Sequence, residues 1–293
     1  MSEIQLDYAK PKLLNEALDI ISKSINPYIL AGGTDLIDMI KEGLVQPDMI
    51  IDLKGIEQFH QLSFKNDALF IGAGVTFSEL IESKIIKEHF PVISELSRTV
   101  ASLGIRNRAT LVGNICSAVP CMDSGPLLVA YDALIMTVGP KGERSVPAEK
   151  WFIGSRKTAI EKGEIVIGIS ISSPGKHGSC FVKLGRYEGE DLAQVNLIIL
   201  ALKNYIFKVS FGSVAPVPVR AKKIEQLING KVITTSLIEE ACKLIEKEIS
   251  PITDIRATKE YRMHMAKIMF ERGLNAAVSR LNGSGPEYGK NLL

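Results

Sequence analysis

The hydrophobic positions near the start of the chain first follow a helical period and then form strand-like runs. The helical set recurs every three or four residues, at Leu13, Leu14, Ala17, Leu18 and Ile21. The apolar run "YILA" (28–31) then leads into a Gly-Gly pair, and "DMIIDLKGI" (48–56) resumes as a strand after a Pro-Asp turn. This alternation predicts a small β-α-β unit over residues 1–55.

A second unit, over residues 56–174, is predicted from a longer mixture of strands and helices. Residues 68–83, "ALFIGAGVTFSELIES", indicate a strand, a glycine turn and a helix that begins at Thr76 or Ser78. The later segments predict a helix, a strand with an internal glycine, a hairpin and a strand with one exposed face, at 89–102, 109–118, 133–152 and 164–174.

The pattern changes again at Pro174-Gly175, where we place a boundary before a C-terminal domain of residues 175–293. Its strands come first, at 179–186 and 197–215, and its helices follow, which is typical of an α+β domain. The expected helix limits are Gly230 as the end of the first, Ser236 as the start of the second, and 258–281 for the third. The tail, 282–293, is expected to be mobile or ordered only by a partner.

Composition and charge exclude several classes of protein. The chain has 293 residues, 46% of them hydrophobic and 23% charged, which suits about two soluble domains. A formal net charge of +2 provides no basic field for nucleic acid. The longest apolar run, 195–202, is too short to span a bilayer, and the N-terminus lacks the apolar core of a signal peptide. We therefore expect a cytoplasmic protein.

The cysteines and histidines predict no metal site. Reduced, buried thiols are expected, because no two pairs of cysteines have zinc or iron–sulfur spacing: the four are Cys116, Cys121, Cys180 and Cys242. The histidines are scattered without metal-ligand spacing and are expected to be surface or internally bonded side chains, at His60, His89, His177 and His264.

Two glycine loops share one chemistry. They are "AGGTDL" (31–36) and "TLVGNICSAVP" (110–120), each predicted at the end of a strand. Glycine allows close approach of a ligand and positive φ, and successive N–H groups in such turns bind anions. Short polar donors lie in both loops, at Thr34, Thr110, Asn114 and Ser117. The two loops are predicted either to hold a pyrophosphate between them or to be ordinary tight turns.

Other motifs are weaker. The "GAGVTF" stretch at Gly72 begins like a dinucleotide fingerprint, but Phe77 stands where a third glycine is required, and no Walker lysine follows any loop. Asp123 is either a functional acid or a turn residue, since Ser-Gly-Pro follows it. Lys183 and Arg186 either pair with a phosphate or flavin or are solvated strand residues. Nothing near Cys116 or Ser117 in sequence favours a nucleophilic triad.

Taken together, these segments resemble the FAD-binding medium subunit of the molybdenum hydroxylases, the xanthine dehydrogenase and carbon monoxide dehydrogenase family. The resemblance covers almost the whole chain. The matching blocks, in order, are "AGGTDLI", "IGAGVTFSEL", "IRNRATLVGNICSAVPCMDSGPLLVAYDA", "LGRYEGEDLAQVN", "GSVAPVPVRA" and "IRATKEYRMHMA". This membership implies an α+β fold: a two-subdomain FAD-binding module of the vanillyl-alcohol-oxidase type (1–55 and 56–174), followed by a C-terminal domain with an antiparallel sheet and helices.

The resemblance also implies the cofactor-binding residues. Two segments match the pyrophosphate loops, Asp123 matches an acid that hydrogen-bonds the cofactor, two valines match apolar positions beside the flavin, and Lys183 matches a nearby lysine. The implied set is Ile29, Leu30, Ala31, Gly32, Gly33, Thr34, Asp35, Leu36, Val100, Thr110, Leu111, Val112, Gly113, Asn114, Asp123, Val166 and Lys183. Val112 departs from the second glycine that many relatives have. Asp35 is expected to face a ribityl hydroxyl or a backbone N–H, because a carboxylate aimed at phosphate would be repelled.

The family implies an electron-transfer role without a catalytic acid–base pair. FAD is expected as the redox centre of this chain, because the four-cysteine insertion of some relatives is missing. The [2Fe-2S] clusters are expected in a small subunit and the molybdenum cofactor in a large subunit of a heteromeric complex, with NAD⁺ or another acceptor. Two alternatives remain open: a self-sufficient FAD-dependent oxidoreductase of the vanillyl-alcohol-oxidase type, and an assembly subunit without flavin.

Overall fold

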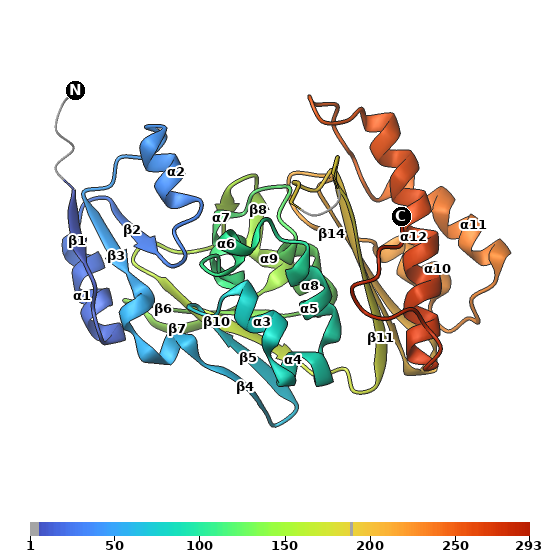
Figure 1. The fold of residues 1–293 in the computed structure, drawn as a ribbon, viewed down its shortest axis with the longest axis horizontal. Coiled ribbons are helices and arrows are strands. Elements are labelled where there is room, and N and C mark those ends of the chain that lie inside the picture. The colour runs from blue at the N-terminus through green and yellow to red at the C-terminus, as the bar shows by residue number, and fades with distance from the viewer. Residues whose placement is uncertain (1–5, 188–189) are drawn as a thin grey trace.

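The computed structural model describes residues 6–187 and 190–293. Residues 1–5 and 188–189 lie outside the described residues. The first group begins the N-terminal segment that is expected not to be a signal peptide, and the second group belongs to the "LGRYEGEDLAQVN" block. In Figure 1 the chain runs from a small N-terminal unit, through a central unit, to a C-terminal sheet covered by helices.

The first unit is the predicted β-α-β arrangement. Its parallel sheet has the strand order β1-β3-β2, where the strands are β1 (Asp7–Ala9), β2 (Pro27–Leu30) and β3 (Met49–Asp52). The helical set from the sequence forms α1 (Leu14–Lys23), whose Ala17 is buried, and α2 (Leu36–Lys41) follows the first glycine loop. Short 3-10 turns, η1 (Leu53–Gly55) and η2 (Glu57–His60), lead into the second unit.

The second unit is built on a five-stranded sheet of order β4-β5-β10-β6-β7. Its strands are β4 (Leu62–Lys65), β5 (Ala68–Gly72), β6 (Leu134–Gly139), β7 (Gly142–Pro147) and β10 (Ile165–Ser172), with a small hairpin of β8 (Phe152–Gly154) and β9 (Lys157–Thr158). The helices are α3 (Phe77–Glu82), α4 (Lys84–His89), α5 (Pro91–Arg98), α6 (Leu103–Arg106), α7 (Leu111–Ser117), α8 (Ser124–Ala130) and α9 (Ala148–Trp151).

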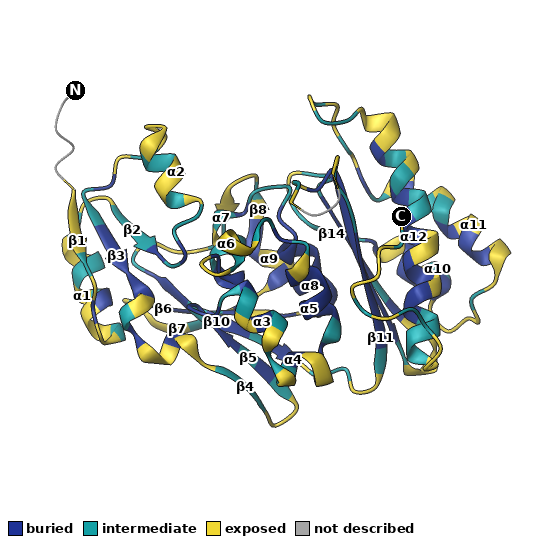
Figure 2. Ribbon diagram, in the orientation of Figure 1, coloured by how far each residue is buried: buried dark blue, intermediate teal, exposed yellow. Residues whose placement is uncertain are grey.

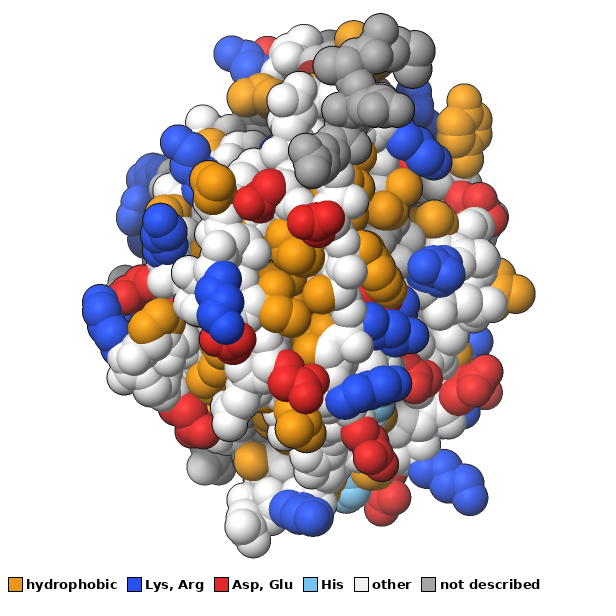
Figure 3. All heavy atoms as spheres, turned by 90° about the vertical axis from the view of Figure 1, so that its left-hand side faces the viewer, with side chains coloured by type: hydrophobic (Ala, Val, Ile, Leu, Met, Phe, Trp, Pro, Cys, Tyr) orange, Lys and Arg blue, Asp and Glu red, His pale blue; other side chains and the backbone are white. Residues whose placement is uncertain are grey.

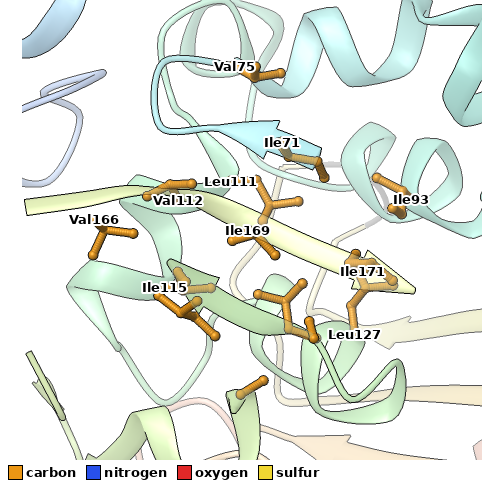
Figure 4. Packing of buried hydrophobic residues seen from close by; sticks show 14 of the residues in the cluster. Ile71, Val75, Ile93, Leu111, Val112, Ile115, Leu127, Val166, Ile169 and Ile171 are labelled. Atoms are coloured by element: carbon orange, nitrogen blue, oxygen red, sulfur yellow. The ribbon is translucent and has the colours of Figure 1, made fainter. Parts of the chain in front are cut away.

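Two expectations for this unit are wrong. Residues 109–118 form no strand: Thr110 caps helix α7 by accepting a hydrogen bond from the Gly113 N–H, and the helix buries Leu111 and Ile115 beside β10 (Figure 4). Strand β10 has no exposed face, because it is the central strand, paired with both β5 and β6 and largely buried (Figure 2). In both cases tertiary packing decided what the local pattern left ambiguous.

The C-terminal domain is an antiparallel sheet whose own helices pack on one face, while the other face packs on the second unit. Its strands, in sheet order, are β11 (His177–Leu184), β12 (Val195–Leu202), β13 (Ile206–Gly212) and β14 (Val219–Arg220). Successive residues alternate between two cores, as the period of a strand requires. Val182 and Ile199 pack in the core that contains helix α12 residues, whereas Phe181 and Ile198 join the core of the second unit, whose helix α8 lies against this face.

The helices of this domain are α10 (Lys222–Ile228), α11 (Thr235–Leu244) and α12 (Lys259–Leu281), with 3-10 turns η3 (Lys203–Tyr205) and η4 (Ile245–Lys247). Gly230 follows α10 with φ +76°, as predicted for a glycine stop. The expected cap at Ser236 is wrong: Thr234 accepts the hydrogen bond from the Leu237 N–H at 3.3 Å.

The C-terminal tail packs on the chain itself, contrary to the expectation of mobility or a partner. The Tyr288 ring lies under the Arg280 guanidinium at 4.0 Å, and the Gly289 N–H donates to Glu95 at 2.9 Å. Glu95 also accepts from Arg280 at 2.8 Å and from the Phe181 N–H at 2.9 Å. A buried carboxylate on α5 therefore fastens the second unit to β11, α12 and the tail.

The surface of the first unit carries charges of both signs. On the side shown in Figure 3, apolar side chains gather in a strip down the centre, with acidic and basic side chains interspersed around it. Among residues 6–187 and 190–293, no helix combines the length and apolar character that crossing a bilayer requires.

Candidate functional site

A cavity of about 360 Å³ opens where the two glycine loops meet. Its lining comes from the first loop, from η1 and η2, from the β5–α3 turn, and from the residues around the second loop: Ala31, Gly32, Leu53, Lys54, His60, Gly74, Thr76, Ser78, Glu79, Asn107, Arg108 and Thr110. Residues of both loops, Ala31 and Gly32 from the first and Thr110 from the second, therefore line one cavity.

Gly32 is the point at which the first loop touches the backbone that leads into the second loop. A Cβ on Gly32 would lie 2.1 Å from the Arg108 carbonyl oxygen, so only glycine fits there. On the other side of the second loop, Phe77 N–H donates to Ala109 O at 3.0 Å, which holds this backbone against the start of α3. Gly32 therefore lines the cavity and also lets the backbone at Arg108 and Ala109 approach closely.

Gly33 and Asp35 set the shape of the first loop. Gly33 has φ +79°, a conformation that is costly for residues with a Cβ. Asp35 accepts a hydrogen bond at 2.5 Å from the hydroxyl of Ser117, at the end of α7. Asp35 is therefore a second tie between the loops.

Lys54 is a cavity residue that sequence reasoning missed. Its ammonium donates to the Ala31 carbonyl at 3.1 Å and pairs with Asp52 at 2.8 Å, while Tyr8 donates to Asp52 at 2.6 Å. Burial opposes ionisation of Asp52, but the bonds from Lys54 and Tyr8 outweigh it and lower its pKa. The only sequence signal was a lysine at the end of a buried strand pattern, which is common and carries little information.

The cavity lining carries side chains of both charges. It contains Lys54, His60 and Arg108 and one carboxylate, Glu79, and Lys54 is itself paired with Asp52. The Glu79 carboxylate already accepts two hydrogen bonds at 2.7 Å, from the N–H and the hydroxyl of Thr76. A cavity lined by residues of both glycine loops, with Lys54 and Arg108 beside them, fits the pyrophosphate of a dinucleotide.

Asp123 and Lys183 form a second cluster, apart from the cavity lining. Their side chains are almost completely buried and meet at 2.6 Å, and the Lys183 ammonium also donates to the Thr99 carbonyl at 2.8 Å. Asn196, which the sequence did not single out, donates to Asp123 at 2.8 Å. Burial raises the pKa of Asp123, although Lys183 and Asn196 both favour its carboxylate form.

The remaining predicted residues connect the two clusters or lie in the core. Asn114 accepts weakly from the Ser124 N–H at 3.4 Å, which links the second loop to the residue after Asp123. Val100, Val112 and Val166 are buried in the core of the second unit. Val112 is absent from the cavity lining and lies among the buried apolar side chains of the second unit (Figure 4).

Several other candidates are explained by local contacts. Arg186 pairs with Asp191 at 3.3 Å rather than with the Asp123 cluster. His177 shares a 2.7 Å hydrogen bond with the Tyr131 hydroxyl. The cysteines are free, but the expectation that all are buried is wrong, because Cys116 lies on the exposed side of α7.

Comparisons with known proteins identify the family. Residues 2–174 match the FAD binding domain in molybdopterin dehydrogenase, and residues 184–277 match the CO dehydrogenase flavoprotein C-terminal domain. The chain belongs to this family of FAD-binding oxidoreductase subunits. The family predicted from the sequence blocks is therefore confirmed, together with its α+β fold.

Relatives in this family match nearly end to end. The chain is 30% identical to the carbon monoxide dehydrogenase medium chain of Afipia carboxidovorans over 94% of this chain and 97% of the relative. It is 27% identical to the xanthine dehydrogenase FAD-binding subunit of Escherichia coli O157:H7, over 94% and 97%. A solved carbon monoxide dehydrogenase from Hydrogenophaga pseudoflava superposes with a TM-score of 0.91 at 29% identity, covering 96% of this chain and 99% of that chain.

Proposed function

We propose that this chain is the electron-transfer subunit of a molybdenum hydroxylase complex. It receives electrons from [2Fe-2S] clusters in a small subunit, substrate oxidation takes place at the molybdenum cofactor of a large subunit, and the electrons pass to NAD⁺ or another acceptor. The observation that carries the proposal is the cavity between two glycine loops in a chain of this family. FAD supplies the redox chemistry when bound.

The protein's part is to bind and orient the cofactor. The loops 29–36 and 110–114 hold the pyrophosphate, with Lys54 supporting the first loop through the Ala31 carbonyl. Asp123 accepts a hydrogen bond from the cofactor, and Lys183 places positive charge near the flavin ring, while Val100 and Val166 supply apolar surface. We also propose the division into units 1–55, 56–174 and 175–293, and a cytoplasmic location.

Gly33→Val tests the assignment of the first loop. Valine is strained at φ +79° and its Cβ would lie 2.8 Å from Leu30 Cδ1, so the loop must change shape. We expect the purified variant to lack the absorbance near 450 nm that bound flavin gives. Gly43→Val is the matched control, because Gly43 has φ +70° but no atom within 4 Å of its Cβ position. A yellow, fully loaded Gly33→Val protein contradicts the assignment.

Copurification separates the proposal from its alternatives. An electron-transfer subunit is expected to bring molybdenum and iron–sulfur subunits through a native pull-down. A self-sufficient FAD-dependent oxidoreductase would carry flavin and oxidise a substrate without them. An assembly subunit would show no flavin absorbance in the wild-type complex, which would overturn the proposed role.

A further inference from the structure

One row of the C-terminal sheet points directly at Asp123. Lys183 on β11 is the register partner of Asn196 on β12, and Asn196 is the register partner of Gly212 on β13. Register partners share a face of the sheet, so Lys183 and Asn196 reach the same carboxylate from neighbouring strands. Asp123 stands at the start of α8 but makes no cap bond to its own helix, so its oxygens are available to these two side chains.

The orientation of the Asn196 amide is determined by its partners. The side chain is fully buried, and its nitrogen lies 2.8 Å from the Asp123 carboxylate and 3.0 Å from the Met122 carbonyl. Both partners are acceptors, so only the NH₂ group can face them. The amide oxygen is thereby turned away, and it is a buried atom without a hydrogen-bond partner.

Gly212 makes this orientation sterically allowed. A Cβ at this position would lie 2.1 Å from the Asn196 amide oxygen, so the unpartnered oxygen occupies space that only a glycine leaves. A buried acceptor without a partner is costly, which argues against a purely structural choice of asparagine at this position. The arrangement is explained by the need for two N–H bonds to the turn before α8, one to the Met122 carbonyl and one to the Asp123 carboxylate.

We propose that Asn196, seated over Gly212, is the positioning residue that holds the Asp123 carboxylate in place for the cofactor. The inference rests on the proposed function, because Asp123 is assigned there as a cofactor contact. Asn196 is placed on the C-terminal domain and Asp123 on the second unit, so the orientation of the acid depends on the docking of the two units. The positive charge of Lys183 stabilises the Asp123 carboxylate, and the hydrogen bond from Asn196 fixes its orientation.

The test uses two variants, one that removes the Asn196 amide and one that displaces it. Asn196→Leu keeps the branched shape and removes both N–H bonds, and Gly212→Ala keeps Asn196 but pushes its amide aside. Ser210→Ala is the control, because Ser210 lies on β13 two residues from Gly212, is fully buried, and has a hydroxyl without a partner. Two quantities are measured on the full-length chain: the Asp123 pKa by carboxyl ¹³C NMR, and the affinity for FAD.

We expect Asn196→Leu and Gly212→Ala to raise the Asp123 pKa, because each removes a donor that favours the carboxylate, and to weaken FAD binding about tenfold. Ser210→Ala should change neither. An unchanged Asp123 pKa in both variants overturns the inference, and so does an equal effect of Ser210→Ala, which would indicate packing alone. If Asn196→Leu does not fold, Gly212→Ala decides. A wild-type chain that binds no FAD refutes the proposed function, while the pKa measurement still judges the positioning role.

Discussion

A single methyl group added to Gly32 would disrupt its contact with the backbone that leads into the second loop. In Gly32→Ala the new Cβ would lie 2.1 Å from the Arg108 oxygen, 2.7 Å from its carbonyl carbon and 2.9 Å from Ala109 Cα. All three are backbone atoms, so no side-chain rotation relieves the overlap. Favourable contacts between non-bonded heavy atoms require roughly 3.5 Å, so the loops must separate by about 1 Å.

The size of the effect follows from two terms. Overpacking of this kind costs about 1–3 kcal/mol of folding free energy. The separation also moves one wall of the cavity, and a displacement of about 1 Å is enough to break a hydrogen bond from a loop N–H to a bound phosphate. We therefore expect FAD affinity to fall at least about tenfold, beyond the loss of stability.

The assay combines urea unfolding with titration of FAD monitored by flavin fluorescence. Gly104→Ala is the matched control: it makes the same substitution in helix α6, near the second loop, where the nearest atom to the new Cβ is 3.9 Å away. Helical propensity predicts that this control is neutral or slightly stabilising. Wild-type stability and FAD affinity in Gly32→Ala would refute the view that close contact of the two backbones builds the cavity.

Two further predictions concern the joints between units. Glu95→Gln should lower the free energy of unfolding by about 3–5 kcal/mol, because it leaves the buried Arg280 side chain without a counter-charge. Lys23→Ala is the control and should change little, because Lys23 pairs with Asp19 on the exposed surface. Equal denaturation curves for the wild type and both variants would contradict the prediction. Burial lowers the pKa of His177 below its ordinary value of 6.5, so the unfolded chain binds this proton more tightly and stability should fall as pH drops below 6.5. His177→Gln should reduce the difference in urea midpoint between about pH 8 and pH 5.5, and a variant with the full wild-type difference would show that another group is responsible.

Local residue patterns were sufficient for several elements of the fold. The period of α1, the hairpin of β6 and β7, and the glycine after α10 all depend on interactions within a few residues. Patterns of that kind failed for 109–118, where buried apolar residues suit a strand or a helix equally well, and packing beside β10 selected the helix α7. Strand β10 was misjudged for a related reason, since only its position between two strands buries it.

The site divides in the same way. The glycine loops and Asp123 can be recognised in the sequence, because glycine allows close approach and positive φ and a carboxylate can bind a ligand. The blocks shared with the family contain the same positions. Lys54 and Asn196 have ordinary neighbours in sequence, and they become important only because folding brings Lys54 to the Ala31 carbonyl and Asn196 to Asp123, 73 residues away along the chain. Hydrogen bonds and steric contacts act over a few ångströms whatever the sequence separation, so the residues that support the site were decided by the tertiary structure.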